Sequence, residues 1–380
     1  MKRIYMDYAA TAPLLEEAWQ AMQPYLCEVF GNPSSIHAEG RAAHAALGAA
    51  RRDMQRALGA AQATEIVFTS GGSEANALAI SGLTRRAENH RNKIITSAIE
   101  HPAVLDQCQA LRREGFEVLV LPVNAEGVLE PDTLAAALDE QVLLLSVMMA
   151  NNEIGAIQPI AALAEHAHQV GAYVHCDAVQ ALGALPIDVQ ALGVDMLSLS
   201  AHKCGGPKGV GALYLRQGLR LAPLVYGGGQ ERGRRGGTEN LPGIVGMAAA
   251  VGRAVQRQPE EALRLAALRD RLIEGILSGI PGATLNGPRE ERLPGNVHVC
   301  FEGVSGQALL SRLDLEGVAA SAGSACHSGT VSPSHVLAAI ARCDAGAALR
   351  LSMGRKSSGE DVDYVLEVLP RLIKELQKTR

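Results

Sequence analysis

The sequence predicts an α/β protein whose main part is a mostly parallel sheet with helices on both faces. Helical patterns at 103–113 and 160–170 alternate with short β-rich runs, and both lie within 64–215. The runs lie at 65–69, 93–96, 117–120, 142–147, 172–175 and 196–199. Because these runs are apolar almost throughout, they are typical of strands buried on both faces, as in a parallel sheet.

The chain changes character after residue 257, which predicts a second and smaller domain. A helical stretch at 241–258 is followed by an amphipathic segment at 260–277 and a strand at 296–300. We expect a large domain at 13–256 and a small α+β domain formed by 1–12 and 257–380. No Pro/Ser-rich linker marks the boundary between them.

A closing helix is predicted from about Gly359. Ser358 and Asp361 have the spacing of a capping pair, in which each side chain accepts a backbone N–H of the other. The apolar residues of this helix repeat on one face, at Val362, Val365, Leu369, Leu372 and Leu376.

The composition is that of a soluble globular protein. The chain has 380 residues, 47% hydrophobic and 20% charged, with a net charge of -5. That charge gives no reason to expect nucleic acid or a membrane as a partner, and the longest apolar run, 142–150, is far shorter than the ~18 residues of a membrane span. Residues 1–7 show no secretory signal, so we expect a cytoplasmic protein.

Seven cysteines are scattered along the chain without a C-x-x-C pair. This pattern argues against a disulfide framework and against a zinc ribbon, so no fixed metal site is expected. Most of the thiols are expected to pack as small apolar side chains.

Lys203 is the candidate anchor of a cofactor. It follows the strand at 195–199 and precedes a glycine-rich turn, a place where a partly desolvated lysine can form a Schiff base with pyridoxal phosphate. A glycine-flanked lysine is equally typical of a solvated turn. The other polar residues at strand ends decide between these alternatives.

Two further segments offer groups for a phosphate and a pyridine ring. The strand ending at Thr69 runs through a glycine turn into a helix from about Ser73, where free N–H groups suit a phosphate, although Ser73 would serve equally well as a plain N-cap. Asp177 follows another strand, where a carboxylate can keep a ring nitrogen protonated or simply cap a helix. Gln180, three residues on, can reach the ring's phenolic oxygen, and Cys176 points to the opposite face.

Two more candidates lie at strand-to-helix junctions. His101 precedes Pro102, which is preset for a first helical turn, and its flat imidazole can stack on a ring or remain in solvent. Asn152 follows the strand at 142–147, where an Asn-Asn pair is also a common turn former.

Ordered segments spread over most of the chain carry a family resemblance. They are GNPSSIH (31–37), FTSGGSEANALAI (68–80), SAIEHPAV (97–104), NNEIGAIQPI (151–160), VHCDAVQALG (174–183), LSAHKCGGPKGVGALY (199–214), RRGGTEN (234–240), SAGSACHSGTVSPSHVL (321–337) and LRLSMGR (349–355). From Asp7 to Arg355 the chain resembles the cysteine desulfurases, fold-type I pyridoxal-phosphate enzymes of the class V aminotransferase superfamily. The resemblance implies a seven-stranded type of sheet and is greatest to the nitrogen-fixation branch.

The resemblance also implies roles around the cofactor ring. Lys203 would form the Schiff base, Asp177 and Gln180 would contact the ring, and Asn152 its phenolic edge. His101 looks like the stacking histidine, with a catalytic role beside Lys203.

Phosphate and substrate contacts are implied in the same way. The phosphate would be held by Gly72, Ser73, Ser200 and His202. Thr238 would reach it from the second subunit of a homodimer. Arg350, with Asn152, would bind the substrate, because a planar guanidinium pairs with a carboxylate through two hydrogen bonds.

Cys326 is the expected sulfur acceptor. It lies in a run of small residues, 321–329, that predicts a mobile loop. The predicted reaction takes sulfur from L-cysteine, releases L-alanine and leaves a persulfide on Cys326, which supplies iron–sulfur cluster assembly, in particular nitrogenase maturation. The persulfide would meet iron only as a transient cluster on an iron–sulfur scaffold or other acceptor protein. Cys204 is the rival thiol, but in an extended segment it would face away from Lys203.

Other functions on the same scaffold are kept as alternatives. They are a housekeeping iron–sulfur or tRNA-thiolation desulfurase, a selenocysteine lyase and a class V aminotransferase. A catalytically idle scaffold that binds a sulfur acceptor is the non-enzyme alternative.

Overall fold

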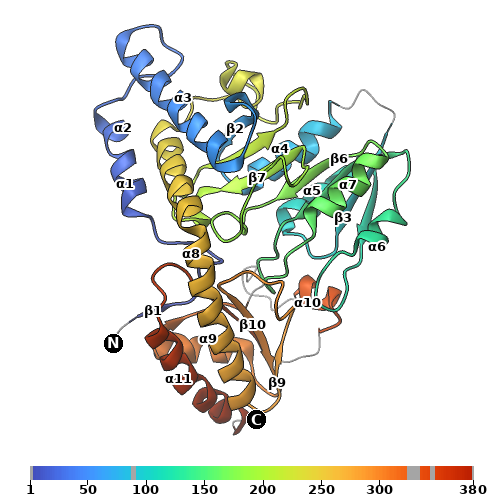
Figure 1. The fold of residues 1–380 in the computed structure, drawn as a ribbon, viewed down its shortest axis with the longest axis vertical. Coiled ribbons are helices and arrows are strands. Elements are labelled where there is room, and N and C mark those ends of the chain that lie inside the picture. Colours follow the sequence, from blue (N-terminus) through green and yellow to red (C-terminus); the bar gives the residue numbers. More distant parts are fainter. Residues whose placement is uncertain (1–2, 87–90, 323–333, 343–346, 379–380) are drawn as a thin grey trace.

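A computed structural model describes residues 3–86, 91–322, 334–342 and 347–378. A seven-stranded sheet forms its centre (Figure 1), in the order β2-β8-β7-β6-β5-β3-β4. The strands are β2 (Ile66–Thr69), β3 (Lys93–Ser97), β4 (Glu117–Leu121), β5 (Val142–Met148), β6 (Tyr173–Asp177), β7 (Met196–Ser200) and β8 (Gly211–Leu215). The six predicted runs are therefore confirmed as strands, and those from β3 to β7 pair in parallel.

β8 is the strand that the sequence pattern did not predict. It lies antiparallel to both of its neighbours, β2 and β7. Gly211 begins it, and a Cβ there would lie 2.6 Å from the carbonyl carbon of Gly71, so only glycine permits this close approach. The strand begins immediately after a glycine-rich turn, so the sequence around its start is typical of a loop and no strand was predicted there.

Helices cover both faces of the sheet. Alternate strand residues point to opposite faces, so Val67 packs with α4 and α5 while Phe68 packs with α3, α7 and α8. The helices are α1 (Glu16–Met22), α2 (Pro24–Cys27), α3 (Ala38–Leu58), α4 (Gly72–Thr84), α5 (Pro102–Arg113), α6 (Pro131–Ala135), α7 (Ile160–Gln169), α8 (Leu241–Gly279), α9 (Gly306–Leu315), α10 (His335–Ala339) and α11 (Gly359–Lys378). Short 3₁₀ turns are η1 (Ala63–Glu65), η2 (Ala201–Lys203) and η3 (Gln230–Gly233).

A smaller antiparallel sheet lies toward the C-terminal end of the chain. It consists of β9 (Ala283–Leu285), β10 (Asn296–Phe301) and β12 (Ala347–Ser352), in the order β12-β10-β9. Beside it, β1 (Ile4–Tyr5) pairs in parallel with β11 (Val318–Ala319). Residues from both chain ends thus share one hydrophobic core with α9 and α11.

One helix, α8, connects the two hydrophobic cores. The sequence predicted two helical stretches here, but the helix continues through Pro259. Val251 belongs to the core of the large sheet and Leu272 to that of the small one, while Leu263 between them is 76% exposed. The domain division at residue 257 stays a prediction, and it would fall inside this helix.

The predicted cap of α11 is present. Asp361 accepts the backbone N–H of Ser358 at 2.9 Å, and Ser358 Oγ accepts that of Asp361 at 3.3 Å. The predicted apolar face of α11 packs into the core of the small sheet.

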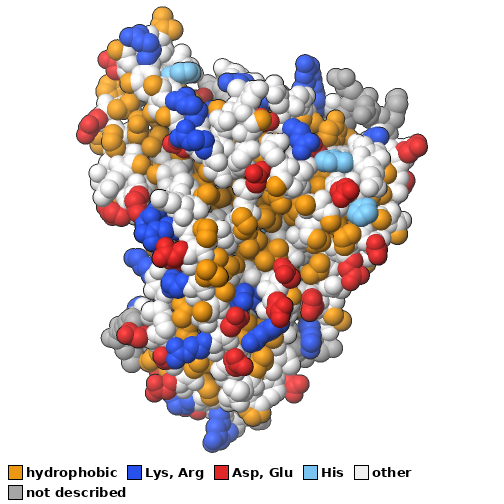
Figure 2. Space-filling model, in the orientation of Figure 1, with side chains coloured by type: hydrophobic (Ala, Val, Ile, Leu, Met, Phe, Trp, Pro, Cys, Tyr) orange, Lys and Arg blue, Asp and Glu red, His pale blue; other side chains and the backbone are white. Residues whose placement is uncertain are grey.

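Charges are mixed over the surface. On the described part of the face in Figure 2, basic and acidic side chains are interspersed, and no large area carries a single sign. This distribution agrees with the small net charge of the chain. Among the described residues no helix is long and apolar enough to cross a membrane.

Candidate active site

A cavity of about 150 Å³ lies where β2, β5, β6 and β7 end and the chain turns toward helices. Open α/β sheets bind their ligands at such carboxyl ends. Every predicted cofactor residue except Thr238 lines this cavity: Gly72, Ser73, His101, Asn152, Asp177, Gln180, Ser200, His202 and Lys203. Residues up to 131 positions apart in the sequence (72 to 203) therefore meet in one place.

The first turn of α4 forms one wall of the cavity. Gly71 is the N-cap and Ser73 is the second helical residue, so the alternative that Ser73 is a plain N-cap is wrong. A Cβ on Gly72 would lie 2.7 Å from Val179 Cγ2, which explains the glycine at this close approach. The free N–H groups of a helix start suit a phosphate.

Asp177 occupies the end of β6 and is 6% exposed. Its Oδ2 accepts a hydrogen bond from Asn76 Nδ2 at 2.7 Å, and its Oδ1 accepts the N–H of Val179 at 3.0 Å. Burial raises the pKa of Asp177, while these hydrogen bonds and the nearby His101 and Lys203 oppose the rise. A cationic ring N–H is the partner that such a buried carboxyl favours.

Asn76 is a pocket residue that the sequence reasoning missed. It lines the cavity one helical turn after Gly72 and is 1% exposed. Its Oδ1 is buried without a hydrogen-bond partner among the described residues. A spacing of four residues on α4 was the signal that would have found it, because such residues share one helix face.

His101 is the N-cap of α5. Its Nδ1 accepts the N–H of Ala103 at 3.1 Å, which assigns the proton of the neutral ring to Nε2. Burial lowers the pKa of His101, and the neighbouring Lys203 lowers it further, against the opposing effect of Asp177. A neutral imidazole with one N–H thus faces the cavity.

Lys203 ends the 3₁₀ turn that follows β7. Its Nζ donates hydrogen bonds to the carbonyl oxygens of Ala9 at 2.6 Å and Ala10 at 2.9 Å. Burial, helped by the positive charge of Arg350, lowers its pKa to about 8. The alternative of an ordinary solvated lysine is wrong for the structure, because the amine is hydrogen-bonded to two backbone carbonyls and the residue lines the cavity.

The segment 7–11 is hydrogen-bonded to residues of the cavity beside Lys203, a role that its sequence did not reveal. Gln180 Nε2 donates to the carbonyl of Ala9 at 2.9 Å, and His202 Nδ1 lies 3.1 Å from Thr11 Oγ1. Three predicted cofactor residues, Gln180, His202 and Lys203, thus hold the same short segment.

Arg350 lies next to the cavity on β12 and is 4% exposed. One of its terminal nitrogens donates to the carbonyl of Asn152 at 2.9 Å, and the other pairs with Asp7 at 2.9 Å. Asn152 itself lines the cavity, so the guanidinium of Arg350 is in direct contact with a residue of the predicted cofactor site.

Thr238 and Cys326 are not brought to the cavity by the described chain. Thr238 is exposed between η3 and α8, and its predicted contribution to a second subunit stays a prediction. Cys326 lies in 323–333, outside the described residues.

Three other cysteines, Cys108, Cys176 and Cys204, are unsuited to nucleophilic attack, because burial raises the pKa of each thiol. Cys108 and Cys176 are buried, as expected of packing residues. Cys204 does not lie in the predicted extended segment, since the chain forms the turn η2 there and its thiol donates to Ala201 O at 3.3 Å. Burial raises the pKa of Cys204 to about 12, so its thiol stays protonated.

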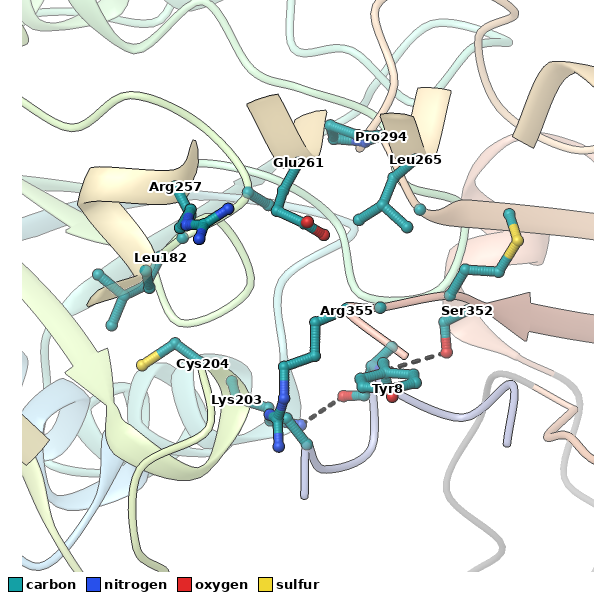
Figure 3. A pocket seen from close by; sticks show the side chains of 18 of the residues that line it. Tyr8, Leu182, Lys203, Cys204, Arg257, Glu261, Leu265, Pro294, Ser352 and Arg355 are labelled. Carbon is teal, nitrogen blue, oxygen red and sulfur yellow. Dashed lines mark hydrogen bonds between the residues drawn. The ribbon is translucent and has the colours of Figure 1, made fainter. Parts of the chain in front are cut away.

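A second, larger cavity of about 570 Å³ adjoins the first (Figure 3). Lys203 and Gln180 line both cavities, whereas the other predicted cofactor residues except Thr238 line only the smaller one. Arg257, Glu261 and Arg355 are among the charged residues around the larger space. The smaller cavity is the candidate active site, because the convergent polar groups are there.

Comparisons with known proteins decide the family. The chain matches the aminotransferase class-V family over residues 4–365. The chain belongs to this family. A cysteine desulfurase IscS of Dictyoglomus turgidum is 48% identical over 380 residues, which are 99% of this chain and 96% of that protein.

Two solved structures support the same grouping. A NifS-like protein is 36% identical with a TM-score of 0.92, covering 99% of this chain and 100% of that chain. The structure named SspA in complex with cysteine is 36% identical with a TM-score of 0.81, covering 93% and 99%. This class-V chain is thus a fold-type I, pyridoxal-phosphate-dependent enzyme of the cysteine desulfurase group.

Proposed function

We propose that this class-V enzyme removes sulfur from L-cysteine, releases L-alanine and leaves a persulfide on Cys326. The observation that carries the proposal is the cavity in which Lys203, Asp177 and His101 meet at the sheet edge. The atoms balance without an oxidant: cysteine and one protein thiol become alanine and one protein persulfide. The carbon–sulfur bond of the substrate breaks and a sulfur–sulfur bond forms.

The residues present fit pyridoxal phosphate. The start of α4 offers N–H groups for the phosphate, and Asp177 offers a buried carboxylate for the ring nitrogen. Asn76, whose Oδ1 has no hydrogen-bond partner among the described residues, lines the same cavity. When bound, the cofactor supplies an electron-accepting ring that stabilises negative charge at the substrate's α-carbon. Gly72, Ser73, Ser200 and His202 would hold its phosphate.

Lys203 is the proposed base that takes the α-proton of the substrate. A base must be neutral before it accepts a proton, and a pKa lowered to about 8 makes a sizeable neutral fraction available near neutral pH. Hydrogen bonds to the carbonyl oxygens of Ala9 and Ala10 restrict the orientations that the amine of Lys203 can take. His101, oriented by the hydrogen bond from the N–H of Ala103, would stack on the ring with its Nε2–H as a proton donor.

Arg350 is the proposed site for the substrate carboxylate, with Asn152 beside it. The guanidinium is buried and already ordered by Asp7 and by the carbonyl of Asn152. Little conformational entropy is lost when such a pre-oriented group binds a carboxylate. The related SspA structure is named as a complex with cysteine, which supports this amino acid as the substrate.

The test is a product balance. Cofactor-loaded protein incubated with L-cysteine and a reducing thiol should release alanine and sulfide in equal amounts. The Cys326→Ser variant should keep the cofactor and lose sulfide release. Transfer of the amino group to a keto acid, without sulfide, would identify an aminotransferase and refute the proposal.

We also propose that the persulfide supplies an iron–sulfur scaffold protein in the cytoplasm. The DLEGVAASAGSAC approach to Cys326 and the PSHVL segment favour nitrogenase maturation, with housekeeping cluster assembly as the second candidate. To distinguish the two candidates, the enzyme carrying a ³⁵S-labelled persulfide is incubated with a purified scaffold protein of each type. The scaffold that accepts the label at least tenfold faster is the physiological acceptor.

A homodimer is the proposed assembly, with Thr238 reaching the partner's phosphate. Thr238 is exposed, and the segment before it is fixed by a buried pair between Glu231 and Arg51, at 2.7 Å. Large apolar side chains are exposed at Phe30, Ile36 and Tyr226. Exposed apolar groups of this size are typical of a subunit interface, and sedimentation of the holoenzyme would show a dimer.

A further inference from the structure

Asn76 is a buried amide among apolar residues of α4. It is 1% exposed, and its neighbours Ala75, Leu78 and Ala79 belong to the hydrophobic core that packs α4 against the sheet. Asparagine is also a poorer helix former than alanine or leucine. An apolar side chain would therefore suit this helix position better, and the amide needs a separate explanation.

The amide of Asn76 is bound to Asp177. Its Nδ2 donates to Asp177 Oδ2 at 2.7 Å, a short distance that is typical of a hydrogen bond to a charged acceptor. An ionised carboxylate only accepts hydrogen bonds, so Nδ2 and not Oδ1 must face it. The amide oxygen is buried and has no hydrogen-bond partner among the described residues. An unsatisfied buried acceptor is costly, which indicates that the contact with Asp177 has a function.

The helix that binds Asp177 also forms the proposed phosphate site. Gly72, in the first turn of α4, and Asn76, one turn later, both line the cofactor cavity. An added Cβ at Gly72 would lie 2.7 Å from Val179 Cγ2, and the N–H of Val179 donates to Asp177 Oδ1 at 3.0 Å. The carboxylate is therefore connected to α4 by two routes, directly through Asn76 and indirectly through the close approach of Gly72 to Val179.

The ionised state of Asp177 depends on few groups. Burial raises its pKa, and the hydrogen bonds from Val179 and Asn76 lower it, as do the charges of His101 and Lys203. Within the described chain, Asn76 is the one side chain that donates a hydrogen bond to this carboxyl. Without the amide, Oδ2 would have no protein donor, so the carboxyl would hold a proton more readily and would be freer to turn away from a ring nitrogen.

We propose that Asn76 is a positioning residue that keeps the Asp177 carboxylate ionised and directed at the ring nitrogen of the cofactor. The inference deepens the proposed function, because it presupposes that Asp177 binds this nitrogen. A carboxylate held in this way needs little reorganisation when a cationic ring N–H binds, and such preorganised charge stabilises the transition state of the reaction. Asn76 acts through Asp177 and takes no part in bond making.

The test compares Asn76→Ala, Asp177→Asn and the double variant, each in the full-length protein. Asn286→Ala is the matched control, because Asn286 is also 1% exposed with an orphaned Oδ1, yet lines neither of the two cavities described above. Three quantities are measured: the Kd of pyridoxal phosphate by equilibrium dialysis, the absorbance spectrum of the bound cofactor, and kcat for alanine formation. The first two require no desulfurase activity.

Asn76→Ala should bind pyridoxal phosphate severalfold more weakly and lower kcat by about 10- to 150-fold, the effect of one lost hydrogen bond to a charged group. The absorbance maximum of the cofactor should shift in the same direction as in Asp177→Asn. In the Asp177→Asn background, Asn76→Ala should add less than about a twofold effect, because the charge through which Asn76 acts is already absent. Asn286→Ala should match the unaltered chain in cofactor affinity and spectrum.

Asn76→Asp is a second variant, of nearly the same volume, that decides the question if Asn76→Ala does not fold. A protonated carboxyl at this position can donate to Asp177 Oδ2 in place of the amide, whereas an ionised one repels it. The ratio of its Kd to that of the unaltered chain should therefore rise between about pH 6 and about pH 9. Taking the ratio largely cancels the titration of His101, Lys203 and Glu100, which lie near Asp177 in both chains. A ratio that does not change with pH would contradict the inference.

Three further results would overturn the inference. One is an unchanged Kd, spectrum and kcat in Asn76→Ala while Asp177→Asn is impaired. Another is an undiminished effect of Asn76→Ala in the Asp177→Asn background, which would show a role independent of Asp177. The third is an equal effect of Asn286→Ala on the cofactor, which would indicate general destabilisation.

Failure of the proposed function would give different results. An unchanged cofactor spectrum in Asp177→Asn would refute the contact between Asp177 and the ring nitrogen, and with it the role of Asn76. An unaltered chain that binds pyridoxal phosphate but forms no alanine from L-cysteine would refute the desulfurase reaction alone. The Kd and the spectrum would then still test the role of Asn76.

Discussion

The ε-amine of Lys203 donates a 2.6 Å hydrogen bond to the carbonyl oxygen of Ala9, 194 residues earlier in the chain. The N-terminal segment therefore contacts a residue of the active-site cavity. Because the acceptor is a backbone carbonyl, side-chain substitution at position 9 does not remove it directly. The bond fixes the amine while burial lowers its affinity for a proton.

The lowered pKa of Lys203 predicts how cofactor capture depends on pH. Only the neutral amine attacks an aldehyde, and its pKa is lowered from 10.5 to about 8. The rate of Schiff-base formation with added pyridoxal phosphate should rise about tenfold per pH unit below 8 and level off above it. Stopped-flow absorbance measures this rate, and a rise that continues to pH 10 would contradict the shift.

Replacing Asp177 by Asn should remove the charge that holds a ring nitrogen protonated. The fold should survive because Asn can still accept the N–H of Val179. We expect alanine formation to fall by about 10²- to 10³-fold, the range for loss of one preorganised electrostatic contact. The matched control is Asp188→Asn, which should keep full activity. Asp188 lies in an exposed turn and also accepts a backbone N–H, that of Gln190.

Two adjacent glycines at the start of α4 allow a steric test of the proposed phosphate site. An added Cβ at Gly72 would lie 2.7 Å from Val179 Cγ2, whereas one at Gly71 would meet nothing within 4 Å. The overpacking cost of about 1–3 kcal/mol should weaken the binding of pyridoxal phosphate to Gly72→Ala by about 5- to 150-fold, as measured by equilibrium dialysis. Equal weakening by Gly71→Ala would show that the contact with Val179 is not the cause.

Arg350→Lys should separate substrate binding from chemistry. Lysine keeps the charge but loses the two-pronged contact with a carboxylate, and such charge-assisted bonds contribute about 1.5–3 kcal/mol. KM for L-cysteine should rise about 10- to 100-fold. An unchanged KM with a reduced kcat would assign Arg350 to catalysis and would refute its role in carboxylate binding.

Much of the fold could be predicted because its strands are short apolar runs. A run such as 142–147 is hydrophobic on both faces, which is typical of a short strand buried between two helical layers. β8 escaped prediction because its place depends on the backbone of Gly71, which is distant in sequence. The continuation of α8 through Pro259 also depends on packing, since both ends of the helix are held by hydrophobic cores.

The pocket residues were predictable to different degrees. Asp177 ends a strand, and Lys203 and His101 come within four residues of one, so strand prediction places all three at one edge of the sheet. Asn76 was missed although its four-residue spacing from Gly72 placed it on the same helix face, and the carbonyl of Ala9 was missed because a backbone group carries no sequence signal. The hydrogen bond from Asn76 to Asp177 joins residues 101 positions apart and required the structure.

Borohydride reduction with peptide mapping tests the central claim most directly. Pyridoxal phosphate is added to the protein, the product is reduced, and the modified peptide is sequenced by mass spectrometry. We predict a single adduct on Lys203, with the exposed Lys208 of the same segment unmodified as an internal control. An adduct on Lys208 or another amine, or no adduct at all, would contradict the claim that this cavity holds the cofactor on Lys203.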